Sequence, residues 1–258
     1  MCRLAVYLGP ETSLEHMVFD TNHSLEKQAW QPKELREARF NADGFGFGWY
    51  NDNAQIARYR QTLPVWGDAN LHDFCASLQR SLWLCYIRSA TPGLGTGIEN
   101  TQPFCYQSWQ FLHNGYINSF NENIRSKVRQ LLHHEIEAII HGTTDSEYLF
   151  ALIMHFFKQS GDMVQAIRDA FLQLKEWLGK ERALLNIVLS DGVQILATSH
   201  AINGLCPSLY YGKDLKDFPR HSQLLVSEPL TDDTNWKAVS SHSLIRIRPD
   251  VLMESLEL

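Results

Sequence analysis

Hydrophobic and polar positions in the first half of the chain follow patterns that are typical of β-strands. Residues 3–8 form a short apolar run that predicts a buried strand, which Gly9-Pro10 should end. In residues 44–50 aromatic side chains alternate with glycines, and a second extended run follows at 55–60, so a hairpin with a polar turn is expected. The pattern further predicts a helix over 71–80 and strands over 82–88 and 109–113.

Apolar residues in the middle of the chain recur every three to four positions, the period of an amphipathic helix. Strands dominate again after the helices, and Asp191-Gly192 between two apolar runs is typical of a two-residue type I′ hairpin turn. The predicted helices cover 123–140, 145–158 and 162–178, and the predicted strands cover 184–190, 193–198, 209–211, 223–226 and 244–248.

The order of these elements predicts the fold class. Strands, then helices, then strands again is a pattern typical of stacked antiparallel sheets with helices on their outer faces, an α+β fold. The chain has no internal repeat, low-complexity tract or linker. We therefore expect residues 1–258 to form a single domain.

Composition and charge exclude several classes of protein. With 44% hydrophobic and 20% charged residues in 258, the chain can bury a large core, which excludes intrinsic disorder. Its formal charge of -6 gives no general electrostatic reason to bind nucleic acid or anionic lipid. No apolar run approaches the roughly 20 residues of a membrane span, and the start lacks the features of a secretory signal. A cytoplasmic protein with a small-molecule or protein partner is expected.

The cysteines and histidines do not predict a metal site. The five cysteines form no CxxC pair, and their odd number favours reduced thiols. His134-Glu135 resembles the start of an HExxH zinc motif, but Ala138 stands where the second histidine should be. The glycine-rich stretches at 44–48 and 93–97 match neither a dinucleotide fingerprint nor a phosphate loop.

The second residue, Cys2, is a candidate nucleophile. Once Met1 is trimmed, its thiol lies beside its own free α-amino group, and the ordinary pKa of each group is about 8. The amine can then take the thiol proton, so that one residue supplies nucleophile and base. The alternative is that Cys2 simply begins a strand as a small apolar residue.

Three later segments could complete a site that acts on an amide. Asn114-Gly115 ends a predicted strand and offers two neutral hydrogen-bond donors for an oxyanion, or it is only a turn. Arg88 at a strand end could bind a carboxylate, or it pairs with a surface acid. Asp145 could bind a substrate ammonium group, although its segment is also suited to cap the following helix.

These segments, in this order, resemble the class II glutamine amidotransferases of the N-terminal nucleophile hydrolase superfamily. The resemblance implies a four-layer αββα sandwich of two antiparallel sheets, and the strand-helix-strand order agrees with it. The residues that carry it are MCRL at the start, NADGFGFGWY at 41–50, IRSATPG at 87–93, FLHNGYI at 111–117 and TTDSEYLF at 143–150.

The resemblance also implies roles for individual residues. Cys2 matches the nucleophile of the family, and the Asn114 side chain with the Gly115 amide matches its oxyanion hole. Arg88, with Thr91 nearby, matches the family's arginine that binds the α-carboxylate of the substrate. Asp145 matches the family's aspartate that binds the α-amino group. The family's hydrolytic chemistry requires neither a metal nor an organic cofactor.

Two further stretches resemble a branch of the family, the stand-alone γ-glutamyl amidohydrolases of ergothioneine biosynthesis. They are DTNHSL at 20–25, with Gln28 and Trp30, and VSEPL at 226–230, with Trp236. We therefore expect hydrolysis of a γ-glutamyl-cysteinyl conjugate through a Cys2 thioester. The alternatives are a glutaminase subunit that supplies ammonia to a separate synthase and a catalytically silent binding protein; a homo-oligomer or a synthase partner also stays open.

Overall fold

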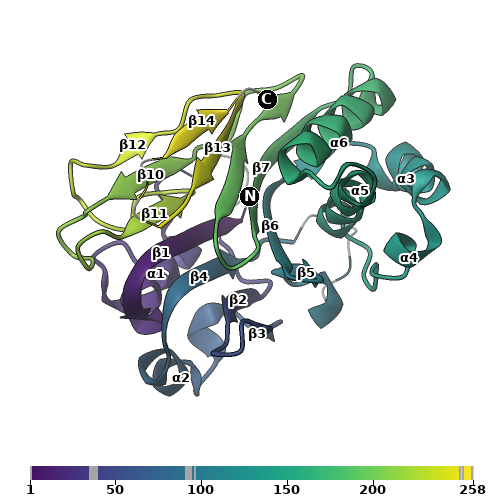
Figure 1. Ribbon diagram of the computed structural model, residues 1–258. Coiled ribbons are helices and arrows are strands. Elements are labelled where there is room, and N and C mark those ends of the chain that lie inside the picture. The colour runs from purple at the N-terminus through teal and green to yellow at the C-terminus, as the bar shows by residue number, and fades with distance from the viewer. Residues whose placement is uncertain are drawn as a thin grey trace.

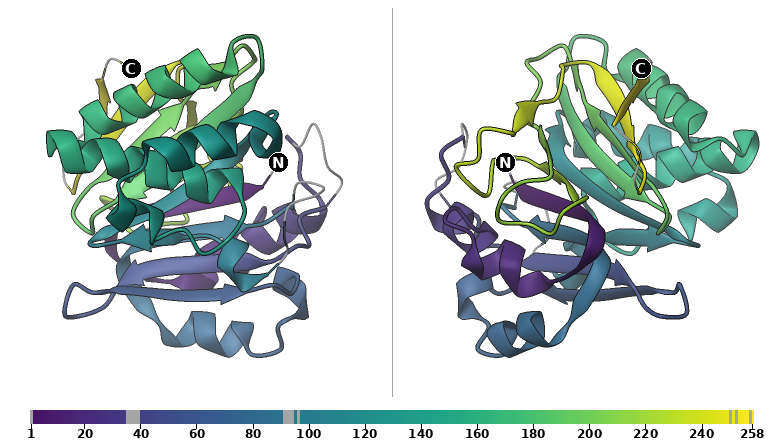
Figure 2. Two further views of the ribbon diagram at one scale, coloured as in Figure 1. Left: turned by 90° about the vertical axis from the view of Figure 1, so that its right-hand side faces the viewer. Right: turned by 60° about the vertical axis from the view of Figure 1, so that its left-hand side comes forward.

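The computed structural model describes residues 2–34, 40–90, 95, 97–249, 251, 253–256 and 258, and its strands form two stacked antiparallel sheets (Figures 1 and 2). The first sheet contains, in spatial order, β12 (Lys237–Ala238), β10 (Tyr210–Lys213), β11 (Gln223–Val226), β1 (Arg3–Ser13), β4 (Gln79–Ile87), β2 (Phe45–Tyr50) and β3 (Ile56–Gln61). The second contains β14 (Glu254–Leu256), β13 (Ser243–Ile247), β8 (Ile195–Ser199), β7 (Ala183–Ser190), β6 (Trp109–Ile117) and β5 (Phe104–Tyr106), and β9 (Ala201–Ile202) pairs with β7.

Helices cover the outer faces of both sheets, which completes four layers. The long helices α5 (Asp145–Ser160) and α6 (Met163–Leu178) pack on each other and on the second sheet, as Figure 1 shows. The short helices α1 (Leu25–Trp30) and α2 (Leu71–Ser77) lie against the first sheet. The remaining helices are α3 (Arg125–Leu131) and α4 (His134–Glu137), with single turns at His16–Asp20, Val65–Gly67, Ile98–Asn100 and Phe120–Ile124. The α+β sandwich predicted above is confirmed.

Alternate side chains of the central strands pack into different hydrophobic cores, one on each face of the sheet. In β1, Leu4 and Val6 belong to the core between the sheets, whereas Ala5 and Tyr7 belong to the core under α1 and α2. Successive side chains of a strand point to opposite faces, so a strand that is buried on both faces must be apolar at every position. This explains the continuous apolar run at the start of the chain.

The first strand is longer than expected. It continues through Gly9-Pro10 to Ser13, with an irregularity in its pairing with β4 between Leu8 and Thr12. Proline is tolerated in strands at such bulges, where no ladder hydrogen bond is lost. A Cβ on Gly9 would lie 2.8 Å from Ser222 Cα, so this glycine permits a close approach of the chain and does not end the strand.

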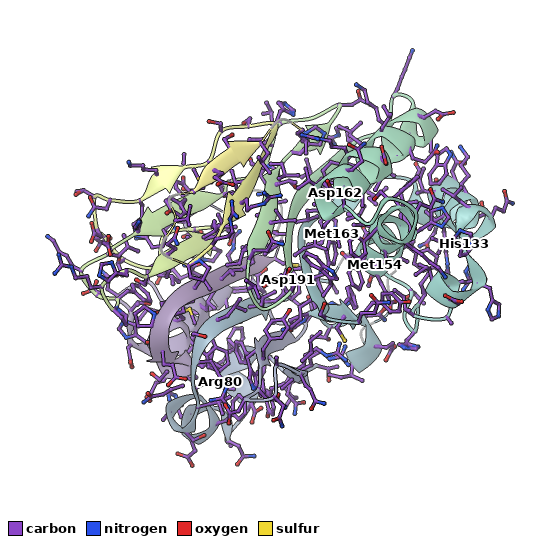
Figure 3. All side chains as sticks on the ribbon, in the orientation of Figure 1. Arg80, His133, Met154, Asp162, Met163 and Asp191 are labelled. Atoms are coloured by element: carbon purple, nitrogen blue, oxygen red, sulfur yellow. The ribbon has the colours of Figure 1, made fainter. Side chains whose placement is uncertain are left out.

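The helix predicted over 123–140 is wrong as a continuous element. After the turn at Phe120–Ile124 and α3, Leu132 and His133 have extended backbones, and α4 then begins at His134. His133 lies beside α3 and α4, as Figure 3 shows. Its amide donates to Nδ1 of His155 on α5 (3.3 Å), so a tertiary contact replaces the helical hydrogen bond.

Two boundaries also differ from the expected ones. Helix α2 ends at Ser77 and β4 begins at Gln79, so the helix is shorter than predicted. The β7–β8 connection is a hairpin, but it has four residues, 191–194, and not a type I′ turn, because the last ladder pair is Ser190 with Ile195. Asp191 Oδ1 accepts backbone hydrogen bonds within this loop.

In the described part of the chain, no helix combines the length and apolarity needed to cross a membrane.

Candidate functional site

Cys2 lies directly before β1, and its side chain is buried at the end of the core between the two sheets. Its Sγ accepts a hydrogen bond from the Tyr86 hydroxyl (2.8 Å) and another from the Ser89 amide (3.2 Å). The thiol also lies 3.4 Å from the Ser89 carbonyl oxygen, to which it can donate. The sulfur is therefore held by groups at the end of the neighbouring strand β4.

Tyr86 is a site residue that the sequence reasoning did not assign. Burial and the neighbouring Cys2 raise the pKa of Tyr86 well above its ordinary value, so the hydroxyl keeps its proton and acts as a donor to sulfur. The β1–β4 register pairs Leu4 with Tyr86 and Arg3 with Ile87. Tyr86 and Arg88 stand two positions apart in the chain. Since side chains two positions apart in an extended segment point to the same face, the sequence already contained an indication that Tyr86 belongs to the site.

Arg88 is a buried cation that has no counterion among the described residues. Its guanidinium donates from Nη2 to the Gly95 carbonyl (2.6 Å) and from Nη1 to the Asp43 carbonyl (3.4 Å). Asp43 uses its own carboxylate to accept a hydrogen bond from the Ala90 amide (2.8 Å). Among the described residues, no carboxylate lies within ion-pair distance of Arg88. The surface ion pair considered above for this arginine is therefore not formed within this part of the chain.

Asp145 is the first residue of α5 and is equally buried. Its Oδ2 accepts from the Ile117 amide of β6 (2.8 Å), and its Oδ1 accepts from the Ser146 amide (2.8 Å). The capping function belongs to its neighbour Thr144, whose Oγ1 accepts from the Glu147 amide (3.3 Å). Within the described residues Asp145 has no cationic partner, and the hydrogen bonds to its carboxylate come from two backbone amides and, at 3.4 Å, from the Ser146 hydroxyl.

Buried polar groups fix the loop that leads into α5. The Glu147 carboxylate accepts from the amides of His141 (2.9 Å) and Gly142 (2.7 Å), and Asn100 Oδ1 accepts from the Thr143 amide (2.7 Å). Burial raises the pKa of Glu147, although these backbone hydrogen bonds oppose the rise. The start of α5, and with it Asp145, is therefore held in place from two sides.

His113 connects β6 to the same helix end. Because the Leu184 carbonyl can only accept, His113 Nε2 must be the donor to it (2.8 Å), and Nδ1 then accepts from the Ser146 hydroxyl (2.9 Å). Burial lowers the pKa of His113, which keeps the ring neutral, and the Leu184 carbonyl fixes this tautomer. The histidine of the HNG segment thus joins β6, β7 and α5.

The Asn114-Gly115 pair lies inside β6, and the expectation that the strand stops there is wrong. Asn114 pairs with Asn186 and Gly115 with Leu185 of β7, so the ladder continues to Ile117. A Cβ on Gly115 would lie 1.8 Å from the Leu184 carbonyl oxygen, which is why only glycine fits. Asn114 Oδ1 is buried and has no hydrogen-bond partner among the described residues.

One small cavity collects most of the residues singled out from the sequence. Cys2, Arg88, Gly115 and Asp145 all line it, and Asn114 precedes Gly115 on the same strand. Thr91, expected near Arg88, lies outside the described residues. The lining residues that the sequence reasoning did not single out for a role are Tyr86, Ser89, Ala90, Asn100, Gln102, Thr144 and Ser146.

Comparison with known proteins identifies relatives that cover nearly the whole chain. A family model described as "Glutamine amidotransferases class-II" matches residues 14–207. The chain is 28% identical over 249 residues to the gamma-glutamyl-hercynylcysteine sulfoxide hydrolase of Mycolicibacterium smegmatis, covering 96% of each protein. It is 25% identical over 299 residues to the "Probable glutamine amidotransferase DUG3" of Saccharomyces cerevisiae, covering 98% of this chain and 83% of the relative.

Solved structures show the same architecture. A "glutamine aminotransferase class-II domain protein" from Silicibacter pomeroyi superposes with a TM-score of 0.74 at 23% identity and covers 99% of this chain and 98% of its own. The glutamine phosphoribosylpyrophosphate amidotransferase from B. subtilis superposes with a TM-score of 0.64 at 15% identity, over 99% of this chain and 49% of its own. At these identities the likeness establishes the fold.

Proposed function

This chain belongs to the class II glutamine amidotransferases, and we propose that it is an amidohydrolase that cleaves a γ-glutamyl-cysteinyl conjugate and releases glutamate. The relative from Mycolicibacterium smegmatis, matched from end to end, supports a conjugate of the kind used in ergothioneine biosynthesis. The alternative is a glutaminase that supplies ammonia to a separate synthase; the yeast relative, named a probable glutamine amidotransferase, is compatible with glutamine as the substrate.

The observation that carries the proposal is a pair of buried opposite charges that do not neutralise each other. Arg88 and Asp145 line one cavity, each is at most 5% exposed, and neither has an ion-pair partner among the described residues. An unpaired buried charge costs free energy, which a ligand of opposite charge can recover. A ligand that satisfies both residues carries a carboxylate and an ammonium group, as the α-carbon of a glutamyl group does.

The Cys2 thiol completes this arrangement as the nucleophile. With the α-carboxylate on Arg88 and the α-ammonium group on Asp145, the glutamyl side chain extends to Cys2 in the same cavity. The sulfur attacks the δ-carbonyl, and the developing oxyanion receives hydrogen bonds from the Asn114 side chain and the Gly115 amide. The resulting thioester is hydrolysed by water, which releases glutamate and the free thiol.

Proton transfer in this mechanism belongs to the α-amino group of Cys2. Once Met1 has been removed, the neutral amine takes the thiol proton and then passes it to the departing nitrogen. Tyr86 keeps its proton and donates a hydrogen bond to the sulfur. No other titratable side chain is needed for the proton transfer.

The proposal is tested by the products that the purified protein forms. Its intact mass should first show the loss of Met1. Incubation with glutamine and with S-substituted γ-glutamyl-cysteine conjugates, and separate assays of glutamate, ammonia and amine, should give a higher kcat/KM for a conjugate. A strong preference for glutamine, or stimulation by a co-purifying synthase, would overturn the hydrolase assignment in favour of the glutaminase.

A further inference from the structure

Two segments that resemble the ergothioneine branch contribute no side chain to the glutamyl cavity, yet they contact each other. They are residues 20–25 with Gln28, and residues 226–230. His23 Nε2 donates to Glu228 Oε1, and the His23 amide donates to the Leu230 carbonyl (3.0 Å). Gln28 Nε2 donates to the carbonyls of His23 (3.0 Å) and Glu228 (3.1 Å). The lining of the glutamyl cavity does not explain these contacts between residues 20–28 and 226–230.

At its centre is an ion pair between Glu228 and Arg3, the residue after the nucleophile. Both side chains are almost fully buried, at 1% exposure, and Arg3 Nη1 lies 3.5 Å from Glu228 Oε2. The Glu228 carboxylate also accepts from the amides of Lys33 (2.8 Å) and Glu34 (3.0 Å). Although burial alone would raise the pKa of Glu228, the His23 and amide hydrogen bonds, with Arg3, hold it below its ordinary value.

A buried ion pair is weak evidence for a contribution to stability. Replacing such a pair by apolar residues of similar volume is often neutral or stabilising, so stability alone does not explain the Arg3–Glu228 pair. Here the pair costs more than usual, because Arg3 Nε and Nη2 have no hydrogen-bond partner among the described residues. Burial accordingly lowers the pKa of Arg3.

The ion pair connects two sides of the site. On one side, it fixes the start of β1, where the backbone of Leu4 and Ser227 is also joined (Ser227 amide to Leu4 carbonyl, 3.0 Å). On the other side, His23 donates to the same carboxylate, and the His23 carbonyl accepts from Gln28 of α1 (3.0 Å). The carbonyl of the next helix residue, Ala29, accepts from the Asn41 amide (2.7 Å), and the carbonyl of Asp43, two positions after Asn41, accepts from Arg88. The carboxylate of Glu228 is thus connected both to Cys2 and to Arg88, the residue proposed to bind the substrate's α-carboxylate.

We infer that Glu228, through its ion pair with Arg3 and its hydrogen bond from His23, is a positioning residue that aligns Cys2 with a glutamyl group held by Arg88. The inference rests on the proposed function for the identity of the nucleophile. It concerns alignment and not the reactivity of the sulfur, so the two properties must be measured separately.

Glu228→Gln removes the charge and preserves the shape of the side chain. We expect kcat for a γ-glutamyl substrate to fall by about 10- to 100-fold and KM to change by less than about threefold, because a small misplacement of reacting groups lowers the rate steeply. Arg3→Met should have a similar effect, and the double variant should lose no more than either single variant. Ile167→Ala on α6, which is fully buried and remote from β1, is the control for loss of stability alone.

Two labelling reactions separate alignment from reactivity. A diazoketone analogue of glutamine must bind in the glutamyl cavity before it alkylates Cys2, whereas iodoacetamide reacts with an exposed or transiently exposed thiol without such binding. In Glu228→Gln, labelling of the Cys2 peptide by the analogue should slow at least about tenfold, and labelling by iodoacetamide should not slow.

Three results would overturn the inference: unchanged labelling by the analogue, an equal loss with both reagents, or the same loss in Ile167→Ala. If the wild-type protein releases no glutamate from any substrate but the labelling pattern holds, the proposed function is wrong and the positioning role stands. The two failures are therefore distinguishable.

Discussion

At the scale of single residues, the sulfur of Cys2 carries the chemistry, because two donors point at it and no other cysteine lines the cavity among the described residues. Cys2→Ser should lose nearly all turnover, since a hydroxyl is far less ionised near neutral pH than a thiol. A variant whose N-terminus is blocked on Met1 should be inactive for lack of the free amine. Steady-state rates with confirmed intact masses check both, and full activity with Met1 retained would refute the proposed base.

Asn114 is expected to act on the transition state. Its side-chain oxygen has no hydrogen-bond partner among the described residues, so removing the side chain breaks no hydrogen bond to that oxygen within this part of the chain. Asn114→Ala should lower kcat by about 10² to 10³ with little change in KM, the loss typical of one oxyanion donor. Asn53→Ala, in the exposed β2–β3 turn, is the control and should behave as wild type. An unchanged kcat in Asn114→Ala would show that the oxyanion hole lies elsewhere.

Arg88 should act mainly on binding. Arg88→Gln leaves Asp145 without a complementary charge across the cavity and removes the grip on the α-carboxylate. We expect KM for γ-glutamyl substrates to rise at least about tenfold, with a smaller fall in kcat from misplacement. Arg80→Gln, near the start of the strand that Arg88 follows, is the matched control, because its partner Asp52 is almost fully exposed. A substrate whose α-carboxylate is amidated should lose affinity for the wild type but not for Arg88→Gln.

At the scale of elements, Gly115 leaves no room for a side chain between β6 and β7. Gly115→Ala would place a methyl group against the Leu184 carbonyl oxygen and should reduce the free energy of unfolding by about 3 kcal/mol or more. Gly161→Ala, at the end of α5 with φ +69° and open space around it, should lose only about 1 kcal/mol. Urea titration of both variants measures the difference, and equal losses would contradict the assigned close approach.

At the scale of the whole molecule, buried histidines should make stability depend on pH. Burial lowers the pKa of His113, His155 and His200, the last to about 4. In the unfolded chain these histidines have a pKa of about 6.5 and become protonated as the pH falls, whereas in the folded protein they stay neutral to lower pH. The free energy of unfolding should therefore decrease as the pH falls from 7.5 to 5.5. The Tm should fall by about 2 to 4 °C for each kcal/mol lost.

His200 offers a direct check of this dependence. It stacks on Phe171 of α6, next to His242, whose charge further disfavours its protonation. His200→Gln should show a shallower fall of Tm with decreasing pH, while His72→Gln, exposed on α2, should retain the wild-type slope. A slope that is the same in all three proteins would exclude His200 as a contributor.

The sequence by itself determined the types of elements and the identity of the candidate site. Apolar residues recur every two positions in a strand and every three to four in a helix, according to which face of the segment is buried. This periodicity can be recognised without knowing the segment against which that face packs. The α+β class, the hairpin after residue 44 and the helices α5 and α6 followed from this. Family resemblance then indicated Cys2, Arg88 and Asp145, although it did not reveal that the last two are buried without counterions in the described part of the chain.

The tertiary structure decided what depends on segments far apart in the chain. Asn114-Gly115 has the composition of a turn, but pairing with β7 keeps it extended, and Tyr86 reaches Cys2 only because β1 and β4 are neighbours in one register. His23 and Glu228 lie 205 positions apart and meet behind the nucleophile. Local patterns carry no information about such pairing, because its free energy depends on which surfaces the fold brings together.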